Sequence, residues 1–175
     1  IYTEGEYFHY TDTPIDSYKN WRLGAPPQWY PTHANAYYTC VTGGTFTHVS
    51  CLGMPSTAGR FQPGSNAYNN RFGTEVALYQ TSEGGMARMV ESRDIPGSHG
   101  EVGRVRGQKG SMFDMTYDGL VDISGVTLAK PPLPPNVEPG GHGGSHGYLC
   151  EEFVTAILQD RAPLVDIVTA LNTTV

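Results

Sequence analysis

The stretch TEVALYQTSEGGMARMVESRD, residues 74–94, decides the fold of this chain. On both sides of Glu83-Gly84-Gly85, apolar and polar residues alternate, as they do in strands that bury one face. Glycine at two successive positions gives the backbone the freedom that a tight reversal needs. The stretch therefore predicts an antiparallel hairpin.

Runs with the same period of two continue outward from this hairpin. TFTHVSCLG (45–53) predicts a strand before it, and EVGRVRGQKGSMFDMTY (101–117) predicts a second hairpin that turns near Lys109-Gly110. GLVDISGVTLA (119–129) predicts a further strand. In EGEYFHY (4–10), alternation places Tyr7 and His9 on one face of a strand.

Before the first of these hairpins, residues 31–42 predict a short helix. Thr32 is placed to cap its N-terminus, and Gly43-Gly44 is placed to end it.

The last part of the chain predicts two more helices. The first runs from about Tyr148 to Asp160, with apolar residues at intervals of three and four, which predicts one buried stripe. Pro163 breaks this helix, and a second begins near Val165. The stripe consists of Leu149, Phe153, Val154, Ile157 and Leu158, and we expect Ile167, Val168 and Leu171 to point inward in the second helix.

Several strands followed by helices are typical of an α+β domain. We predict a largely antiparallel β-sheet with helices packed on one face, while the other face is free or paired. The stretch KPPLPPNVEP (130–139) predicts an extended connector, because proline lacks a backbone donor. A chain of 175 residues fits a single domain over residues 1–175.

The composition excludes several partners. A formal net charge of -6, with lysine and arginine scattered, leaves no basic stripe for nucleic acid. No apolar run approaches the ~20 residues that a membrane span needs. Cys40, Cys51 and Cys150 form no CxxC pair, so we expect buried thiols and no structural metal. Ile1 and Val175 look like cut ends, and we expect a piece of a longer protein.

The first part of the chain combines aromatic rings with imidazoles. Tyr7 and His9 pair a phenol with an imidazole, which suits proton transfer at a hydroxylated substrate, and the alternative is an aromatic strand that packs on the core. His33 falls in the first turn of the predicted helix, where the helix dipole lowers its pKa and favours a neutral proton acceptor. The alternative is a histidine with a purely structural role.

Side chains near His33 suit a carbohydrate ligand. Trp29 and Tyr30 offer flat faces of the kind that stack on sugar rings, and Arg22 offers a rigid fork of donors.

The glycine-rich loop GGHGGSHG (140–147) precedes the first C-terminal helix directly. Glycines such as Gly143 let backbone N–H groups approach ligand oxygens at a helix N-terminus, and His142 and His146 add donors. The alternative is a flexible connector. A metal site is not expected, because no cysteine or acidic ligand stands beside the two histidines.

One glycine motif fails the test for a dinucleotide loop. GEVGRVRG (100–107) lies inside strand-like sequence and has no helical pattern behind it. The chain is therefore expected to carry no cofactor domain of its own.

The motifs EYFHY, NWRL, QWYPTHANAYYTCVTGG, GQKGSM and GGHGGSHGYLCEEFVTAIL together resemble the Gfo/Idh/MocA superfamily of NAD(P)-dependent sugar and polyol oxidoreductases. The chain looks most similar to the branch that contains the NAD-dependent family 109 glycoside hydrolases. The resemblance implies a C-terminal substrate domain whose N-terminal Rossmann domain is absent from this chain. It implies NAD or NADP in the full-length parent and no cofactor bound to this chain alone.

The resemblance also implies roles for single residues. Tyr7 and His9 match the YxH of the glycosidase branch, and with His33 they are the expected catalytic residues. His33 falls at the histidine of the wider DxxxH motif, although Trp29 replaces its acidic residue. The expected substrate contacts are Arg22, Trp29, Tyr30, His142, Gly143 and His146.

Three functions stay open at this point. The parent is expected to oxidise a sugar or polyol, with this fragment inactive alone. A redox-type glycoside hydrolase is the alternative within the same resemblance. A non-catalytic binding or oligomerisation module is the alternative from another class, and a homo-oligomer through the sheet face is expected in either case.

Overall fold

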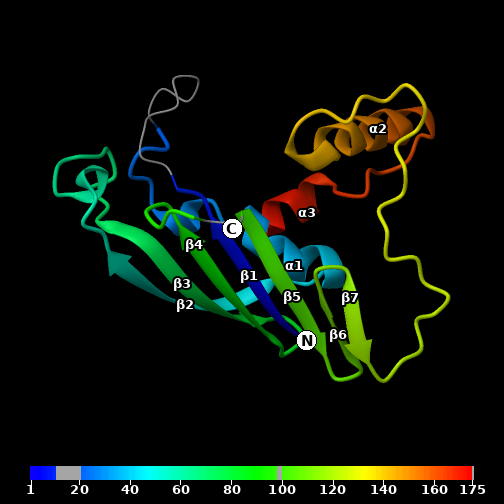
Figure 1. Cartoon of the computed structure of the whole chain (residues 1–175), viewed down its shortest axis with the longest axis horizontal. Coiled ribbons are helices and arrows are strands. Elements are labelled where there is room, and N and C mark those ends of the chain that lie inside the picture. The colour runs from blue at the N-terminus through cyan, green and yellow to red at the C-terminus, as the bar shows by residue number, and fades with distance from the viewer. Residues whose placement is uncertain (11–20, 98–99, 175) are drawn as a thin grey trace.

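The structure is a computed structural model, and it describes residues 1–10, 21–97 and 100–174. Seven strands form one sheet in the order β2-β3-β4-β1-β5-β6-β7 (Figure 1). β1 and β4 pair in parallel, and the other five neighbouring pairs are antiparallel. The strands are β1 (Tyr2–Phe8), β2 (Phe46–Pro55), β3 (Phe72–Thr81), β4 (Met86–Ser92), β5 (Gly100–Gly107), β6 (Gly110–Phe113) and β7 (Thr116–Gly119).

Three α-helices accompany the sheet in the described residues: α1 (Thr32–Thr42), α2 (Ser145–Leu158) and α3 (Ile167–Asn172). Short 3-10 helices are η2 (Pro27–Trp29), η3 (Gly59–Phe61) and η4 (His142–Gly144). α1 lies across one face of the sheet, whereas α2 stands apart at the end of a long connector (Figure 1). The α+β class predicted from the sequence is therefore confirmed. Of the α-helices in the described residues, α1 packs on a face of the sheet as predicted, whereas α2 does not (Figure 1).

Two glycines allow α1 to lie directly on the sheet. A Cβ atom at Gly5 in β1 would stand 2.3 Å from the carbonyl oxygen of Ala34. A Cβ atom at Gly103 in β5 would stand 2.4 Å from the ring of Tyr37. Side chains at these positions would push the helix away, so their absence determines where α1 packs.

The alternation of side chains gives the sheet two faces. The helix-covered face carries the residues that point to α1, including the fully buried Ala77, Ala87 and Met89. The residues between them point to the opposite side, called the open face here. On this face Glu4 forms ion pairs with Arg88 and Arg104.

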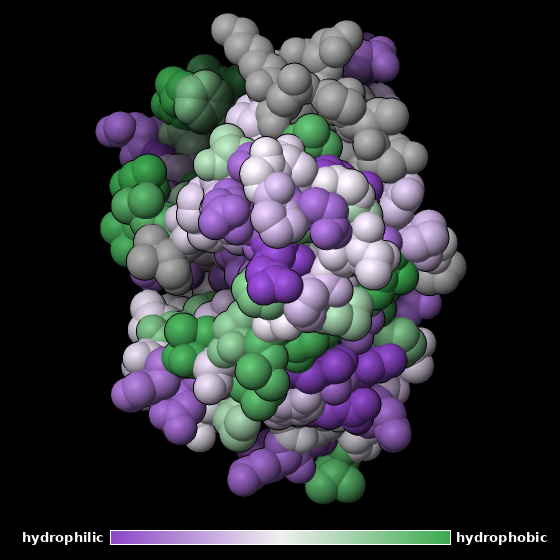
Figure 2. Space-filling view, turned by 90° about the vertical axis from the view of Figure 1, so that its left-hand side faces the viewer, coloured by the Kyte–Doolittle hydropathy of each residue, from purple (hydrophilic) through white to green (hydrophobic). Residues whose placement is uncertain are grey.

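Apolar residues of the open face remain exposed near the β2 edge. Figure 2 looks at this edge, where green hydrophobic patches alternate with hydrophilic residues. Leu52 in β2 is 82% exposed, and the other exposed apolar residues here are Met54 in β2, Val76 and Leu78 in β3, and Met86 in β4.

Most predicted strands are confirmed. The hairpin of residues 74–94 forms β3 and β4, and its turn lies at Ser82–Gly85. The strand of residues 45–53 and the second hairpin also form. The further strand over residues 119–129 is wrong, because β7 ends at Gly119. The Asp122 carboxylate accepts a hydrogen bond from the N–H of Ser124, and such a local turn competes with strand pairing.

The predicted end of α1 is confirmed, but its predicted start and cap are not. α1 ends at Gly43, whose φ of 67° is the left-handed conformation of a glycine stop. Thr32 is already the first helical residue, and Pro31 takes the cap position without a side-chain hydrogen bond. Prediction of Thr32 as the N-cap was therefore wrong by one residue.

The apolar stripe of α2 was predicted to be buried, and this was wrong. Phe153 is 63% exposed and Leu158 is 80% exposed. The same holds for α3, where Ile167 is 72% exposed instead of pointing inward. The pattern of both helices is amphipathic as predicted, but nothing in the described residues covers their apolar sides. α2 also begins at Ser145, and α3 begins at Ile167, so both predicted starts were displaced.

The cysteines were predicted to be buried thiols, and this was also wrong. Cys40, Cys51 and Cys150 are free and exposed. Cys40 and Cys150 lie on helix sides that point away from the sheet, where local pattern does not distinguish a thiol from a polar residue.

Candidate functional site

The candidate site lies where β1 ends and α1 begins. The phenol ring of Tyr7 lies 4.4 Å from the imidazole of His33 and 6.0 Å from the ring of Tyr30, measured between centroids. His33 and Tyr30 are 5.3 Å apart, and His9, one residue beyond β1, lies 5.5 Å from Tyr7. Four aromatic or imidazole rings predicted from separate motifs therefore meet at one end of the sheet.

Two guanidinium groups lie against these rings. The Cζ atom of Arg93, just after β4, is 4.9 Å from the ring centre of Tyr7 and 5.3 Å from that of Tyr30. Arg22 lies over the other rim, with its Cζ atom 4.4 Å from the centre of Tyr30. Such cation–π contacts hold planar donors beside flat ring faces. The site can thus combine stacking with hydrogen-bond donation to a ligand.

A carboxylate lies beside the imidazole of His33. The Nδ1 atom of His33 lies 3.3 Å from a carboxylate oxygen of Glu101 in β5. This proximity favours the tautomer that carries its proton on Nδ1. In that tautomer Nε2 has the lone pair and can accept a proton.

Burial keeps the site's titratable groups uncharged. Burial lowers the pKa of His33, and the neighbouring charge of Glu101 opposes this change only in part. Burial also lowers the pKa of His9, with Arg93 acting in the same direction. The pKa of Tyr7 is raised by burial, against the effect of Arg93. Near pH 7 the imidazoles are therefore neutral acceptors and the phenol is a donor.

A row of titratable residues crosses the sheet at the level of Tyr7. Strand register places Glu91 between Glu75 and Tyr7, and places Glu101 on the other side of Tyr7. Glu91 is fully buried, and neither carboxyl oxygen has a hydrogen-bond partner. Burial raises the pKa of Glu91 to about 9, although Arg93 lies 4.0 Å away. A neutral carboxylic acid thus lies beneath the site.

The glycine loop approaches this cluster. His142 lies close enough to His33 to lower its pKa electrostatically. The rings of His142 and His146 are 5.0 Å apart. Gly143 has a φ of 64° and Gly144 a φ of 93°, so the turn into α2 depends on glycine at these positions. The predicted residue His142 therefore lies near the site, and its ring neighbours that of His146.

Trp29 differs from the predicted catalytic residues because its side chain is largely exposed. Its side chain is 69% exposed, and its ring meets the edge of Tyr68 at 5.1 Å. It lines a small hollow with Arg22, Tyr30 and Arg93. Trp29 can thus contact a ligand only at the outer edge.

The described residues contain neither a metal-binding cluster nor a membrane-spanning helix. No group of three or more His, Cys, Asp or Glu side chains within residues 1–10, 21–97 and 100–174 is arranged to hold a metal ion. No helix in this part of the chain combines the length and apolarity that crossing a membrane requires.

Sequence reasoning missed Arg93, Glu91 and Glu101. Each belongs to a strand that is adjacent in the sheet but distant in the chain from Tyr7. The charged residue in the buried run MVES was a signal for Glu91, because strands rarely bury an acid without a purpose. No local signal indicated Glu101, since its role depends on pairing between β1 and β5.

Comparison with known proteins adds a fold relationship. No protein-family model matches the chain, and no curated protein matches it significantly. An oxidoreductase domain protein from Kribbella flavida has a similar structure, with a TM-score of 0.67, 16% identity and coverage of 98% of this chain and 52% of that chain. Levoglucosan dehydrogenase in complex with NADH and levoglucosan gives a TM-score of 0.65 at 12% identity. The match covers 99% of this chain and 52% of that chain. An aldose-aldose oxidoreductase from Caulobacter crescentus complexed with glycerol gives a TM-score of 0.61 at 16% identity. The match covers 99% of this chain and 50% of that chain.

At these identities the similarity shows the fold alone. The α+β fold of this chain is similar to that of part of each of these proteins. The chain spans about half the length of each of these proteins.

Proposed function

We propose that this chain is the substrate-binding part of an NAD(P)-dependent oxidoreductase that acts on a sugar or polyol. The observation that carries the proposal is the cluster of Tyr7, Tyr30 and His33, where Tyr7 and His33 lie 4.4 Å apart beside the guanidinium group of Arg93. The shared fold supports it, because matched proteins of that fold are named as sugar or polyol dehydrogenases.

The chain's own residues supply binding and proton transfer. Tyr30 and Trp29 present ring faces to a sugar, and Arg22 and Arg93 donate hydrogen bonds to its oxygens. His33 accepts the proton of the reacting hydroxyl at Nε2, while Glu101 holds the imidazole through Nδ1. Tyr7, whose ring lies 4.4 Å from that of His33, is the second residue placed to take part in this proton transfer.

The cofactor belongs to the other half of the parent protein in this proposal. A nicotinamide dinucleotide supplies hydride transfer at the carbon that bears the hydroxyl. The motif GEVGRVRG forms β5, which pairs with β1 and β6, and so it is not a strand-to-helix phosphate loop. An N-terminal Rossmann domain would therefore hold NAD or NADP, and this chain alone would bind neither and remain inactive.

A redox-type glycoside hydrolase is the second candidate, and the pairing of Tyr7 with His9 at 5.5 Å favours it. A ketone formed on the sugar acidifies the neighbouring C–H bond. His33 would remove that proton, because the raised pKa of Tyr7 keeps its phenol protonated. The leaving group would depart, water would add to the resulting double bond, and the hydride would return from the cofactor to the ketone carbon. Product analysis of the parent with an aryl glycoside separates the two: free aglycone indicates hydrolysis, and a keto sugar without aglycone release indicates dehydrogenation.

We also propose a homo-oligomer through the open face of the sheet. Leu52, Met54 and Leu78 are exposed there, beside the ion pairs of Glu4. Sedimentation of the chain and its Leu52→Lys variant tests this: the variant is expected to dissociate, and an unchanged mass contradicts the proposal.

Two experiments test the main proposal. Calorimetric titration of the chain is expected to show no NAD⁺ binding and weak binding of a sugar, and tight NAD⁺ binding contradicts it. In the parent, His33→Ala is expected to lower kcat about 10²-fold or more with a smaller change in stability. Retained activity with a collapsed melting temperature would assign His33 a structural role.

A matched test addresses the loop. Gly143→Val in the parent is expected to raise KM while the melting temperature changes little. Valine is strained at a φ of 64°, so the substitution is expected to change the conformation of the glycine loop. An unchanged KM would remove the loop from the binding site.

A further inference from the structure

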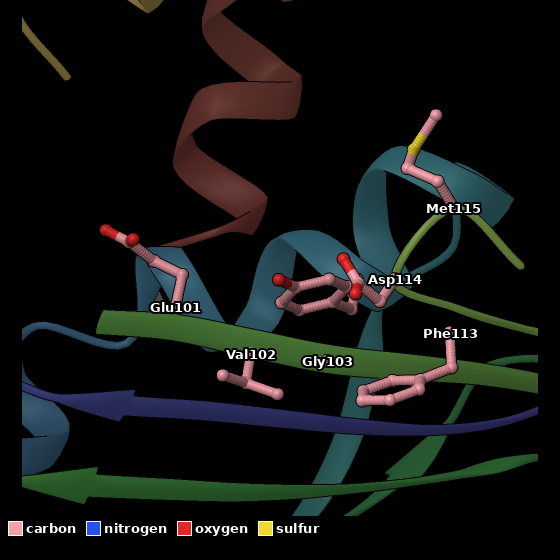
Figure 3. A pocket seen from close by; sticks show the side chains of 7 residues that line it. Glu101, Val102, Gly103, Phe113, Asp114 and Met115 are labelled. Carbon is pink, nitrogen blue, oxygen red and sulfur yellow. The ribbon is translucent and has the colours of Figure 1, made fainter. Parts of the chain in front are cut away.

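A second hollow adjoins the candidate site on the helix-covered side of β5. Its volume is about 440 Å³, within the range of roughly 300–1,000 Å³ typical of ligand pockets. Figure 3 shows Glu101, Asp114 and Met115 on one side of β5, while Val102 and Phe113 point to the other side. The hollow is thus lined from α1, from β5, and from the end of β6 with the turn that follows it.

The floor of this hollow is aromatic. Tyr37 follows His33 by one turn of α1, so both side chains point toward β5. The Tyr37 ring covers Gly103, where any Cβ atom would lie 2.4 Å from it. Burial raises the pKa of Tyr37, and Glu101 acts in the same direction, which places the phenol near that carboxylate. A phenol that stays protonated can donate and accept hydrogen bonds.

The outer wall depends on a strained turn. Asp114 and Met115 have φ values of 46° and 60°, a left-handed conformation that favours glycine and strains other residues. This turn places a carboxylate and a thioether at the hollow instead of the glycine that a two-residue turn prefers. The seven lining residues include no lysine or arginine.

Glu101 joins the hollow to the candidate site. Its carboxylate lies 3.3 Å from His33 and also lines the hollow. A ligand whose reacting carbon lies at His33 therefore extends past Glu101 and over Tyr37.

We propose that this hollow binds the second ring of an uncharged saccharide whose first ring lies against the rings of His33 and Tyr30. Hydroxyl groups of the second ring donate to the carboxylates of Glu101 and Asp114, and its apolar face lies against Tyr37 and Met115. An acidic or phosphorylated second ring is disfavoured because Glu101 and Asp114 line the hollow and none of its seven lining residues is a cation. The inference rests on the proposed function and narrows its substrate to neutral glycosides or disaccharides.

The test compares neutral disaccharides with their component monosaccharides and with glucose 6-phosphate. NMR titration of this chain measures each affinity for cellobiose, maltose and lactose against glucose and galactose. At least one disaccharide is expected to bind about tenfold more tightly than its monosaccharides, the effect of one or two hydrogen bonds to a carboxylate. Glucose 6-phosphate is expected to bind more weakly than glucose.

Variants locate the effect. Asp114→Gly removes the carboxylate and suits the positive φ, so the preference for the disaccharide is expected to disappear. Asp114→Asn keeps the shape and is expected to relieve the discrimination against glucose 6-phosphate. Asp118→Asn, on the open face of β7, is the matched control and leaves both preferences unchanged.

Equal affinity for disaccharide and monosaccharide, or equal effects of the Asp114 and Asp118 variants, overturns the second subsite. Monosaccharide binding that survives in that case leaves the proposed function intact. Absence of binding by every sugar overturns both.

Discussion

Helices α1 and α2 both carry apolar residues at helical spacing, yet they have opposite fates in the structure. On α1, Ala34 and Tyr38 are almost fully buried against the sheet. On α2, Leu149 and Phe153 are each 63% exposed. The difference comes from the surface that each helix meets. α1 meets a sheet whose glycines admit it, whereas in the described residues α2 lies against the connector, the glycine loop and the segment that follows the helix. The spacing of apolar residues therefore predicts which side of a helix is apolar. It does not predict which other element, if any, packs against that side.

The largest expected effect separates matched truncations on the two helices. Tyr38→Ala is expected to cost about 3–5 kcal/mol, because a buried ring is replaced by a cavity and Glu83 loses its hydrogen-bond donor. Phe153→Ala is expected to cost less than about 1 kcal/mol. Urea unfolding of both variants measures the difference. Similar losses for the two would mean that α2 is packed as firmly as α1.

The contact between α1 and the sheet is tested by adding a single Cβ atom at Gly5 in β1. Gly5→Ala is expected to destabilise the chain by about 3 kcal/mol, since its Cβ atom would stand 2.3 Å from the Ala34 carbonyl oxygen. Gly59→Ala is the control, because no atom lies within 4 Å of a Cβ there. Midpoints of urea unfolding report both changes, and a tolerated Gly5→Ala would show that α1 does not rest on β1.

The buried acid beneath α1 makes stability depend on pH. The folded pKa of Glu91, about 9, is above its ordinary value of 4.5, so stabilisation is complete below pH 4.5 and is lost as the pH rises toward 9. The free energy of unfolding is expected to fall by about 2 kcal/mol between pH 6.5 and pH 8, given about 1.4 kcal/mol per pH unit. Glu91→Gln is expected to remove this slope.

The exposed Glu138→Gln serves as the control for Glu91 and keeps the slope of the original chain. A flat profile in the unmodified chain, measured by urea unfolding at several pH values, would mean that Glu91 is charged and compensated when folded.

The smallest effect concerns the start of α1. Glu101 raises the pKa of His33 against the effect of burial, so Glu101→Gln is expected to lower that pKa further. Asp118→Asn, on the open face, leaves it unchanged. Titration of the His33 ring protons by NMR follows both variants. A rise in the pKa of His33 would place the carboxylate elsewhere.

Local sequence pattern was sufficient for most of the sheet. The turns at Glu83-Gly84-Gly85 and Lys109-Gly110 were predicted because glycine and alternation act over neighbouring residues. The insertion of β1 between β4 and β5 was not predicted, since pairing between distant strands leaves no local trace. The exposed stripe of α2 was predicted as buried for the same reason.

The candidate site was predicted in part. Tyr7, Tyr30 and His33 were identified from their motifs, and the structure brings these rings together. Arg93 and Glu101 were missed because they reach the site through strand order and register. The roles of all these residues remain part of the proposal.

The most direct test is an NMR titration of this chain with neutral sugars, observed at its histidine side chains. His9 and His33 belong to the candidate site, whereas His48 is exposed on β2. A saturable shift of His9 and His33 with His48 unmoved is the predicted result. If all three resonances stay in place, or if His48 moves with the others, the rings beside α1 are no carbohydrate site.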